Sequence, residues 1–162
     1  MYIIRVALQL LLFFRWCDKE YAQKKMKFVS KKENETIRFA FEFAKGLKGG
    51  DVICLDGDLG AGKTTFTKGL ALGLGIDCEV TSPTFSLLNT YSSKKWKLYH
   101  IDAYRLKNAE EAFASGLCDY IFSSDAVVVI EWFENISQIL PKDFKKISLK
   151  YVRESMREVT VF

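Results

Sequence analysis

The sequence predicts an α/β domain with a mixed, mostly parallel sheet flanked by helices and a C-terminal antiparallel hairpin. Three observations lead to this prediction. Two short runs, 52–55 and 126–130, are wholly apolar, which is typical of strands buried on both faces of a sheet. Apolar residues recur at helical intervals on either side of the first run. Near the end of the chain, apolar and polar residues alternate with the period of a half-buried strand.

The first two predicted helices flank the run 52–55. Ser30-Lys31-Lys32-Glu33 has the spacing of a capping box, which opens a helix. Gly49-Gly50 ends this helix, whose apolar positions are Ile37, Ala40, Phe41, Ala44 and Leu47. The second helix is predicted over residues 65–74, with Gly75 at its end.

The remaining elements follow a loop at residues 81–84. Strands are predicted at 85–91 and 96–101, joined by a polar turn at 92–95. A short helix over 109–115 ends at Gly116. The C-terminal hairpin is expected to turn at Glu154-Ser155, with alternating apolar residues at Ile147, Leu149, Tyr151, Val159 and Val161.

Composition and charge describe an ordinary globular chain of 162 residues, the size of one domain. Residues 1–25 carry five basic and two acidic side chains, whereas the remainder carries 19 basic and 18 acidic ones. The near-neutral remainder argues against a large nucleic-acid surface. The four cysteines lie far apart in sequence and there is one histidine, which excludes a Cys-x-x-Cys pair and a histidine-rich metal site.

Residues 1–25 are interpreted as an N-terminal extension outside a single domain that spans 26–162. The apolar run from Tyr2 to Phe14 is interrupted by Arg5 and Gln9 and is shorter than the roughly 20 residues that cross a membrane. Arg15-Trp16-Cys17 follows it in place of the small residues of a cleavage site. We therefore expect no membrane role and favour Met26 as the start of translation.

Residues 57–64, Gly-Asp-Leu-Gly-Ala-Gly-Lys-Thr, have the spacing of a Walker A loop between a buried strand and a helix. Glycines let consecutive backbone amides point at phosphate oxygens, and the positive end of the following helix adds to their field. Lys63 is expected to reach the β- and γ-phosphates, and the Thr64 hydroxyl to bind Mg²⁺. A P-loop NTPase-like domain is thus predicted, whose nucleotide-binding residues are Asp58, Leu59, Gly60, Ala61, Gly62, Lys63, Thr64 and Thr65.

Acidic residues end two of the predicted strands. Glu131 follows the run 126–130 as in a Walker B element, where it could hold Mg²⁺ through water or orient the attacking water; an ordinary surface acid is the alternative. Alternation places Asp102 on one side of its strand with His100 and Tyr104. Asp102 could bind Mg²⁺ or the nucleophilic water, or it could pair with Arg105 at the surface, and spacing leaves both open. His100 is interpreted as structural.

Four motifs occur in the order seen in the TsaE (YjeE) family, which the chain resembles over residues 26–162. They are Gly57–Thr65, Ser82-Pro83-Thr84-Phe85, His100-x-Asp102-x-Tyr104-Arg105 and Glu131-Trp132. TsaE proteins are bacterial P-loop ATPases of tRNA threonylcarbamoyladenosine synthesis. The resemblance implies a cytoplasmic ATPase that binds ATP or ADP with Mg²⁺ and acts with TsaB and TsaD. TsaD transfers the threonylcarbamoyl group to the adenosine beside the anticodon, so contact of the ATPase with tRNA is expected to be indirect.

The resemblance also implies roles for individual residues. Lys63, Asp102 and Glu131 resemble the catalytic residues, and Thr64, Glu131 and Asp102 resemble the metal ligands. Trp132 is expected at the nucleotide or partner surface, with core packing as the alternative. A switch loop near the γ-phosphate is expected at Thr81, Ser82, Pro83, Thr84 and Phe85.

Two other functions stay open on the residues alone. A small-molecule P-loop kinase needs a substrate pocket and usually an arginine-bearing lid, yet Arg105 stands alone between Arg38 and Arg153. A nucleotide-gated binding module with negligible turnover needs the same phosphate loop as an ATPase. A GTPase is disfavoured because no Asn-Lys-x-Asp segment is present, and an ABC-type ATPase because no Leu-Ser-Gly-Gly-Gln segment is present.

Overall fold

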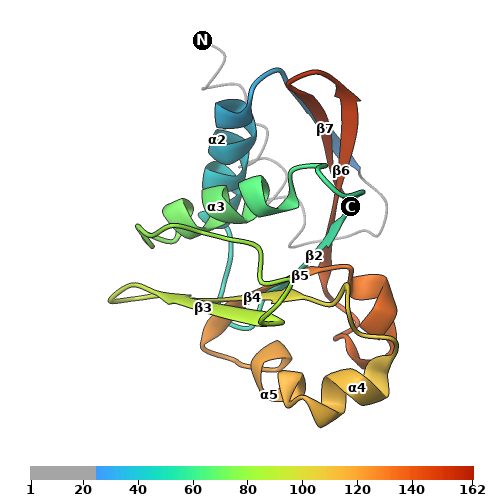
Figure 1. The fold of residues 1–162 in the computed structure, drawn as a ribbon. Coiled ribbons are helices and arrows are strands. Elements are labelled where there is room, and N and C mark those ends of the chain that lie inside the picture. Colours follow the sequence, from blue (N-terminus) through green and yellow to red (C-terminus); the bar gives the residue numbers. More distant parts are fainter. Residues whose placement is uncertain (1–24) are drawn as a thin grey trace.

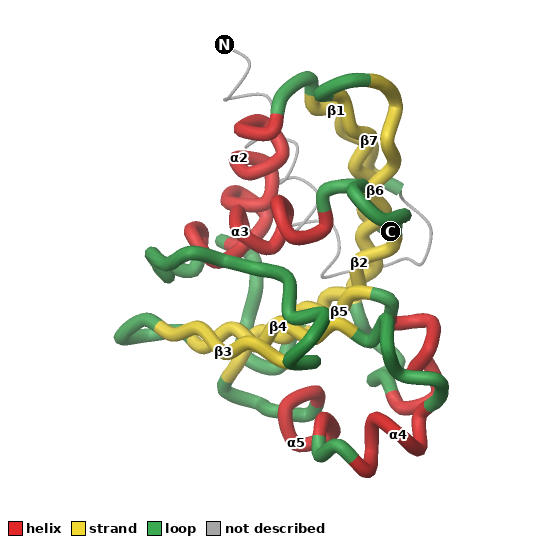
Figure 2. The backbone as a smooth tube through the Cα atoms, viewed as in Figure 1, coloured by secondary structure: helices red, strands yellow, loops and turns green. Residues whose placement is uncertain are grey.

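A computed structural model of the protein describes residues 25–162, which form one seven-stranded mixed sheet with helices on both faces (Figures 1 and 2). The strand order is β1-β7-β6-β2-β5-β4-β3. The central strands β6, β2, β5 and β4 are parallel, whereas β1, β7 and β3 pair antiparallel with their neighbours. The strands are β1 (Met26–Ser30), β2 (Val52–Asp56), β3 (Leu88–Ser92), β4 (Lys97–Asp102), β5 (Ala126–Glu131), β6 (Lys145–Arg153) and β7 (Met156–Val161). The predicted α/β class and the C-terminal hairpin are confirmed.

Two helices, α2 (Glu33–Ala44) and α3 (Lys63–Gly73), cover one face of the sheet (Figure 1). The opposite face is covered by α4 (Ala109–Ala114), α5 (Leu117–Ile121) and the 3₁₀ segment η1 (Phe133–Ile139). The α2 and α3 backbones touch at Gly69 and Gly73, where a Cβ would collide with main-chain carbonyl oxygens of α2. This close approach fixes α3, and with it the loop that precedes it, against the sheet.

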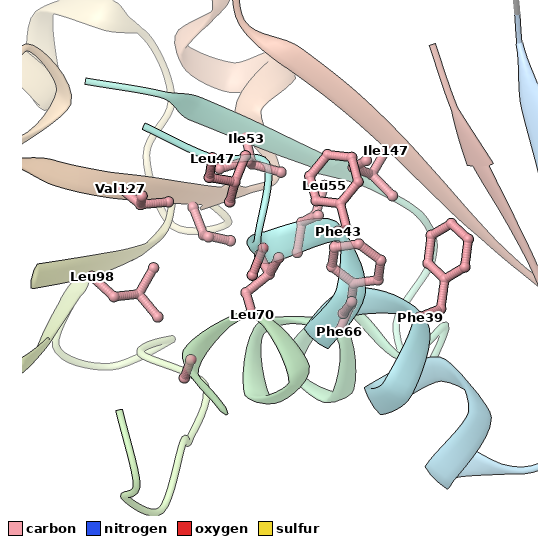
Figure 3. Close-up of a cluster of buried hydrophobic side chains, with 14 of the residues drawn as sticks. Phe39, Phe43, Leu47, Ile53, Leu55, Phe66, Leu70, Leu98, Val127 and Ile147 are labelled. Atoms are coloured by element: carbon pink, nitrogen blue, oxygen red, sulfur yellow. The ribbon is translucent and has the colours of Figure 1, made fainter. Parts of the chain in front are cut away.

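The core on the α2–α3 side follows from strand alternation. Ile53 and Leu55 of β2 and Val127 of β5 point from the sheet toward Phe43, Phe66 and Leu70 of the helices (Figure 3). Leu98 of β4 and Val129 of β5 belong to the same cluster. Because successive strand residues alternate between faces, His100, Asp102 and Glu131 project to this side as well. The polar ends of β4 and β5 therefore lie on the face that carries α3.

Several local predictions were wrong. The predicted capping box does not form. Lys32, not Ser30, is the residue before α2, and its side chain makes no cap hydrogen bond. Ser30 instead ends β1, and its hydroxyl accepts a hydrogen bond from the Thr36 hydroxyl. The strand predicted at 85–91 begins only at Leu88, since residues 84–86 form a turn in which Leu87 N–H donates to the Pro83 carbonyl at 2.7 Å. β1, α5 and η1 were not predicted from the sequence. The extension proposed at 1–25 lies, apart from Lys25, outside the described residues.

The first helix also ends earlier than predicted, at Ala44 rather than at Gly49-Gly50, so Leu47 packs in the core from the loop after α2. The other predicted elements agree with the structure within about two residues at the bounds that were predicted. Gly75 and Gly116 end α3 and α4 with positive φ angles, and Ser155 forms the turn between β6 and β7 with a φ of 60°. Over residues 25–162, no helix combines the length and the apolar character needed to cross a membrane.

Candidate nucleotide-binding site

The glycine-rich loop follows the C-terminal end of the central strand β2, at the end of the sheet where the parallel strands finish, and leads into α3 at Lys63. A Cβ at Gly57 would collide with the Leu149 carbonyl oxygen of β6, so the chain can pass here only as glycine. Gly62 precedes α3 with a φ of 103°, a left-handed conformation that glycine adopts without strain. The loop thus aims the N-terminal amides of α3 at the space beyond the sheet edge, as an anion site requires.

The Lys63 side chain curls back into this loop and is only 5% exposed. Its Nζ donates to the carbonyl oxygens of Gly57 at 2.6 Å and Asp58 at 3.0 Å. It also lies 4.4 Å from the centre of the Trp132 ring. Both hydrogen-bond acceptors are neutral, so the ammonium charge is available to a bound anion.

Glu131 ends β5 directly opposite the start of α3. Its Oε1 accepts a hydrogen bond from the Thr64 hydroxyl at 3.3 Å and lies 2.9 Å from His100 Nε2. The side chain is buried, although its position at a strand end would also suit an exposed acid. The structure therefore places the predicted Walker B acid beside the Walker A threonine.

Asp102 is the neighbour of Glu131 in the parallel pairing of β4 with β5. Its Oδ2 accepts hydrogen bonds from the hydroxyls of Thr84 at 2.6 Å and Ser82 at 3.3 Å. Its Oδ1 accepts from the Tyr104 backbone N–H at 2.9 Å, and β4 ends at Asp102, so strand alternation does not extend to Tyr104. The alternative pairing of Asp102 with Arg105 does not form, because both Asp102 oxygens bond to Ser82, Thr84 and Tyr104 instead. The Arg105 guanidinium lies 5.9 Å from the centre of the Phe85 ring.

Side-chain hydrogen bonds hold the loop that contains residues 81–85 at two points. At its start, the Asn89 side-chain amide of β3 donates to the Thr81 carbonyl and hydroxyl oxygens at 3.2 and 3.3 Å. Within the loop, the Ser82 and Thr84 hydroxyls donate to the Asp102 carboxylate. Phe85 at the tip is 90% exposed. The predicted switch loop therefore connects an edge strand to an acidic residue of the candidate site.

Trp132 is half-buried and turns away from the sheet with a left-handed φ of 57°. Its ring packs against Tyr104, with 5.1 Å between the ring centres, and lies under the Lys63 ammonium. It also borders the apolar cluster beneath α4 and η1. One side of the Trp132 ring thus faces the P-loop and another borders the core, while a position at the nucleotide or partner surface stays a prediction.

Arg157 of β7 is a residue at this site that the sequence analysis missed. Its Nε donates to the Ala61 carbonyl at 3.1 Å and its Nη2 to the Gly60 carbonyl at 3.3 Å. It therefore holds the P-loop from the C-terminal hairpin. Nothing local in the sequence indicates this contact, because the bonded residues lie 96 and 97 positions apart.

The oxygen atoms gathered at the site are of the kind that Mg²⁺ prefers. They belong to the Thr64 hydroxyl and to the carboxylates of Glu131 and Asp102. Residues 25–162 contain no group of three or more His, Cys, Asp or Glu side chains placed to hold a metal by themselves.

Comparison with known proteins gives a consistent result. The family model described as "Threonylcarbamoyl adenosine biosynthesis protein TsaE" matches residues 30–159. The chain is 43% identical over 136 residues to the tRNA threonylcarbamoyladenosine biosynthesis protein TsaE of Treponema pallidum, covering 84% of this chain and 99% of that protein. It is 42% identical over 137 residues to the protein of the same name from Bacillus subtilis, covering 85% of each.

Among solved structures, the crystal structure of YdiB from Bacillus subtilis resembles this fold with a TM-score of 0.73. The two chains are 37% identical, and the match covers 88% of this chain and 87% of that one. The resemblance in sequence and the resemblance in fold thus extend over nearly the same part of the chain.

Proposed function

Because the chain belongs to the TsaE family, we propose that it is the ATP-binding and ATP-hydrolysing component of tRNA threonylcarbamoyladenosine synthesis. The observation that carries this proposal is the pairing of the buried Lys63 ammonium inside the P-loop with the Thr64–Glu131 contact beside it. The Lys63 ammonium is suited to bind phosphate, and the next residue, Thr64, is a candidate metal ligand that contacts Glu131, the candidate catalytic acid. Names of relatives support the pathway, and these residues support the chemistry.

The P-loop binds the phosphates of ATP or ADP. Backbone amides from the loop and the first turn of α3 hold the phosphate oxygens, while the Lys63 ammonium exchanges its carbonyl contacts for the β- and γ-phosphates. Trp132, already against Lys63, borders the bound nucleotide. The nucleotide-binding set is Asp58, Leu59, Gly60, Ala61, Gly62, Lys63, Thr64, Thr65 and Trp132.

Thr64, Glu131 and Asp102 are the residues that would hold Mg²⁺. The metal, when bound, supplies positive charge that neutralises the phosphate oxygens during transfer. Glu131 orients the attacking water through its carboxylate, and Asp102 serves the same water or the metal. The catalytic residues are accordingly Lys63, Asp102 and Glu131.

Residues 81–85 act as a switch between nucleotide states. Both Ser82 and Thr84 donate hydrogen bonds to the Asp102 carboxylate. If Asp102 were to serve a metal or the attacking water, its carboxylate would have to give up one or both of these hydrogen bonds, and the segment that carries the exposed Phe85 would then be free to move. A nucleotide can change partner affinity only if the partner distinguishes the two states, and this loop provides that difference.

The partners are TsaB and TsaD, and the site of action is the cytoplasm. TsaD performs the transfer to tRNA, whereas ATP hydrolysis by this chain supports repeated cycles, so its own contact with tRNA is indirect. We also place the whole ATPase unit in residues 26–162, so that removal of 1–25 should leave nucleotide affinity unchanged. Intact mass of the mature protein tests whether 1–25 are retained.

The kinase alternative loses support because the matching family model and the relatives from Treponema pallidum and Bacillus subtilis are all named TsaE. It predicts phosphoryl transfer to metabolites, whereas an ATPase releases phosphate without any acceptor. The binding-module alternative differs only in turnover.

One experiment separates these functions. The protein is purified with TsaB and TsaD, and phosphate release from Mg-ATP is measured for wild type, Lys63→Ala and Glu131→Ala. We expect partner-stimulated release by wild type, weakened nucleotide binding by Lys63→Ala, and retained binding with slow hydrolysis by Glu131→Ala. Absence of turnover by wild type with both partners present would refute the ATPase assignment.

A further inference from the structure

His100 is a buried polar residue whose position the proposed function does not explain. Its side chain is fully buried in β4, on the same face of the sheet as Asp102. Its Nε2 lies 2.9 Å from Glu131 Oε1, whereas Nδ1 is the one buried side-chain nitrogen or oxygen atom of residues 25–162 without a hydrogen-bond partner. A partnerless polar atom in a core costs free energy, so a residue that merely filled this space would be apolar.

The hydrogen bond fixes which ring nitrogen carries the proton. A carboxylate only accepts hydrogen bonds, so the proton between His100 and Glu131 must belong to Nε2. A proton on Nδ1 would instead be a buried donor without an acceptor. The geometry points to the tautomer with Nε2–H donating to Glu131.

We propose that His100 is a positioning residue that fixes the Glu131 carboxylate for ATP hydrolysis. This inference rests on the proposed function of the site. Both hydrogen bonds of the carboxylate end on Oε1, from Thr64 and from His100, which leaves Oε2 to orient water. The imidazole sits on a central strand and has no exposed surface, so it is a fixed anchor for a side chain with three rotatable bonds.

Thr64 alone would be a weaker anchor for this carboxylate. Its hydroxyl is 3.3 Å from Oε1, longer than the 2.9 Å contact of His100, and it is also a candidate metal ligand. Residues that orient a ligand or catalytic group from behind typically change activity by about 10–100-fold when they are removed. We therefore expect the loss of His100 to lower the turnover number while the nucleotide affinity stays near that of the wild type.

Two amide substitutions make a matched test. In His100→Gln the amide nitrogen is as many bonds from Cα as Nε2 and can still donate to Glu131, whereas in His100→Asn it reaches only the position of Nδ1. Turnover of Mg-ATP in the presence of TsaB and TsaD should stay within about threefold of wild type for His100→Gln and fall by about 10–100-fold for His100→Asn. ADP affinity and the midpoint of thermal unfolding should be alike in the two variants. Equal turnover by both variants would overturn the proposal.

A spectroscopic measurement tests the His100–Glu131 hydrogen bond directly. It needs neither an activity assay nor a folded His100→Asn variant. His100 is the only histidine in the chain, so ¹⁵N NMR of the untagged, nucleotide-free protein reports its ring unambiguously. We expect a proton on Nε2 that exchanges slowly with water in the wild type and rapidly in Glu131→Ala. A proton on Nδ1, or the same slow exchange in Glu131→Ala, would overturn the proposal. Absence of wild-type turnover would instead refute the proposed function, and the NMR result would still decide the His100–Glu131 contact.

Discussion

The Thr64 hydroxyl lies 3.3 Å from Glu131 Oε1 and so joins the first turn of α3 to the end of β5. The two residues are 67 positions apart in sequence, and the parallel pairing of β2 with β5 brings them together. This contact connects the residues that would bind nucleotide to the acid that would act on it.

Glu131→Gln keeps the size of the side chain and removes its charge. We expect ADP affinity to stay within about threefold of wild type and the turnover number for ATP to fall by about 100-fold or more, as is typical for loss of a group that activates water. Calorimetric titration and a phosphate-release assay measure the two quantities. Glu134→Gln, at an exposed position three residues later, is the control and should behave as wild type. Undiminished hydrolysis by Glu131→Gln would remove Glu131 from the mechanism.

Thr84→Val removes the 2.6 Å hydrogen bond that ties the switch loop to Asp102. Hydrogen bonds to charged groups contribute about 1.5–3 kcal/mol, so amides of residues 81–87 should exchange with deuterium about tenfold faster or more in the nucleotide-free variant. Adding nucleotide should then change their exchange less than it does in the wild type. Thr90→Val, at an exposed position on β3, serves as the control. Exchange rates that match the wild type would show that Asp102 does not restrain the loop.

Arg157→Met removes the side-chain donors that hold the Ala61 and Gly60 carbonyls. Two hydrogen bonds of about 0.5–1.5 kcal/mol each stabilise the P-loop in its present shape, so ADP affinity should fall by about 5–100-fold. Arg153→Met lies on the same hairpin at an exposed position and should leave affinity unchanged. Isothermal calorimetry makes the comparison, and equal affinity of the two variants would contradict a role for Arg157 in shaping the loop.

Cys54 of β2 should resist alkylation in the folded protein. Burial raises the pKa of its thiol to about 12, with the negative charge of Glu134 adding to the effect. The reactive thiolate is therefore scarce at pH 8, and the side chain has no exposed surface. Mass mapping after brief maleimide treatment should find Cys78, which is exposed, labelled before Cys54. Prompt labelling of Cys54 in the native state would show that β2 opens readily.

The same shift of pKa predicts a pH dependence of stability. The Cys54 pKa is raised on folding from 9.0 to about 12, so above pH 9 the unfolded chain loses this proton while the folded protein retains it. Stability should fall as the pH rises from about 9 to 12, by at most about 1.4 kcal/mol per pH unit from this group. Denaturant unfolding of wild type and Cys54→Ala at pH 8 and pH 10 isolates the contribution. An equal loss in both proteins would assign the dependence to other groups.

Local patterns predicted most of the fold and the P-loop, because strand, loop and helix are consecutive in sequence. Lys63 and Thr64 could be placed for the same reason, and Glu131 because a buried apolar run precedes it. The edge strand β1 was missed because Met26–Ser30 is short and half polar, and it is stabilised by pairing with β7, far along the chain.

The contacts that complete the site depend on strand order, which no local pattern reveals. His100 and Glu131 are 31 residues apart and meet only because β4 lies beside β5. Arg157 reaches the P-loop because the β6–β7 hairpin packs beside β2, with β6 next to it. The spacing of Asp102 and Arg105 suggested a pair, but Thr84 and Ser82 occupy the carboxylate instead.

Calorimetric titration of the purified protein with Mg-ADP tests whether the P-loop binds a nucleotide. We expect saturable binding of one nucleotide per chain, weakened at least tenfold by Lys63→Ala because a charged hydrogen bond to phosphate is lost. Lys68→Ala, which changes an exposed lysine of the same helix, should bind as wild type. If the folded wild-type protein gave no heat of binding with Mg-ADP, either alone or together with TsaB and TsaD, residues 57–64 would not form a nucleotide site.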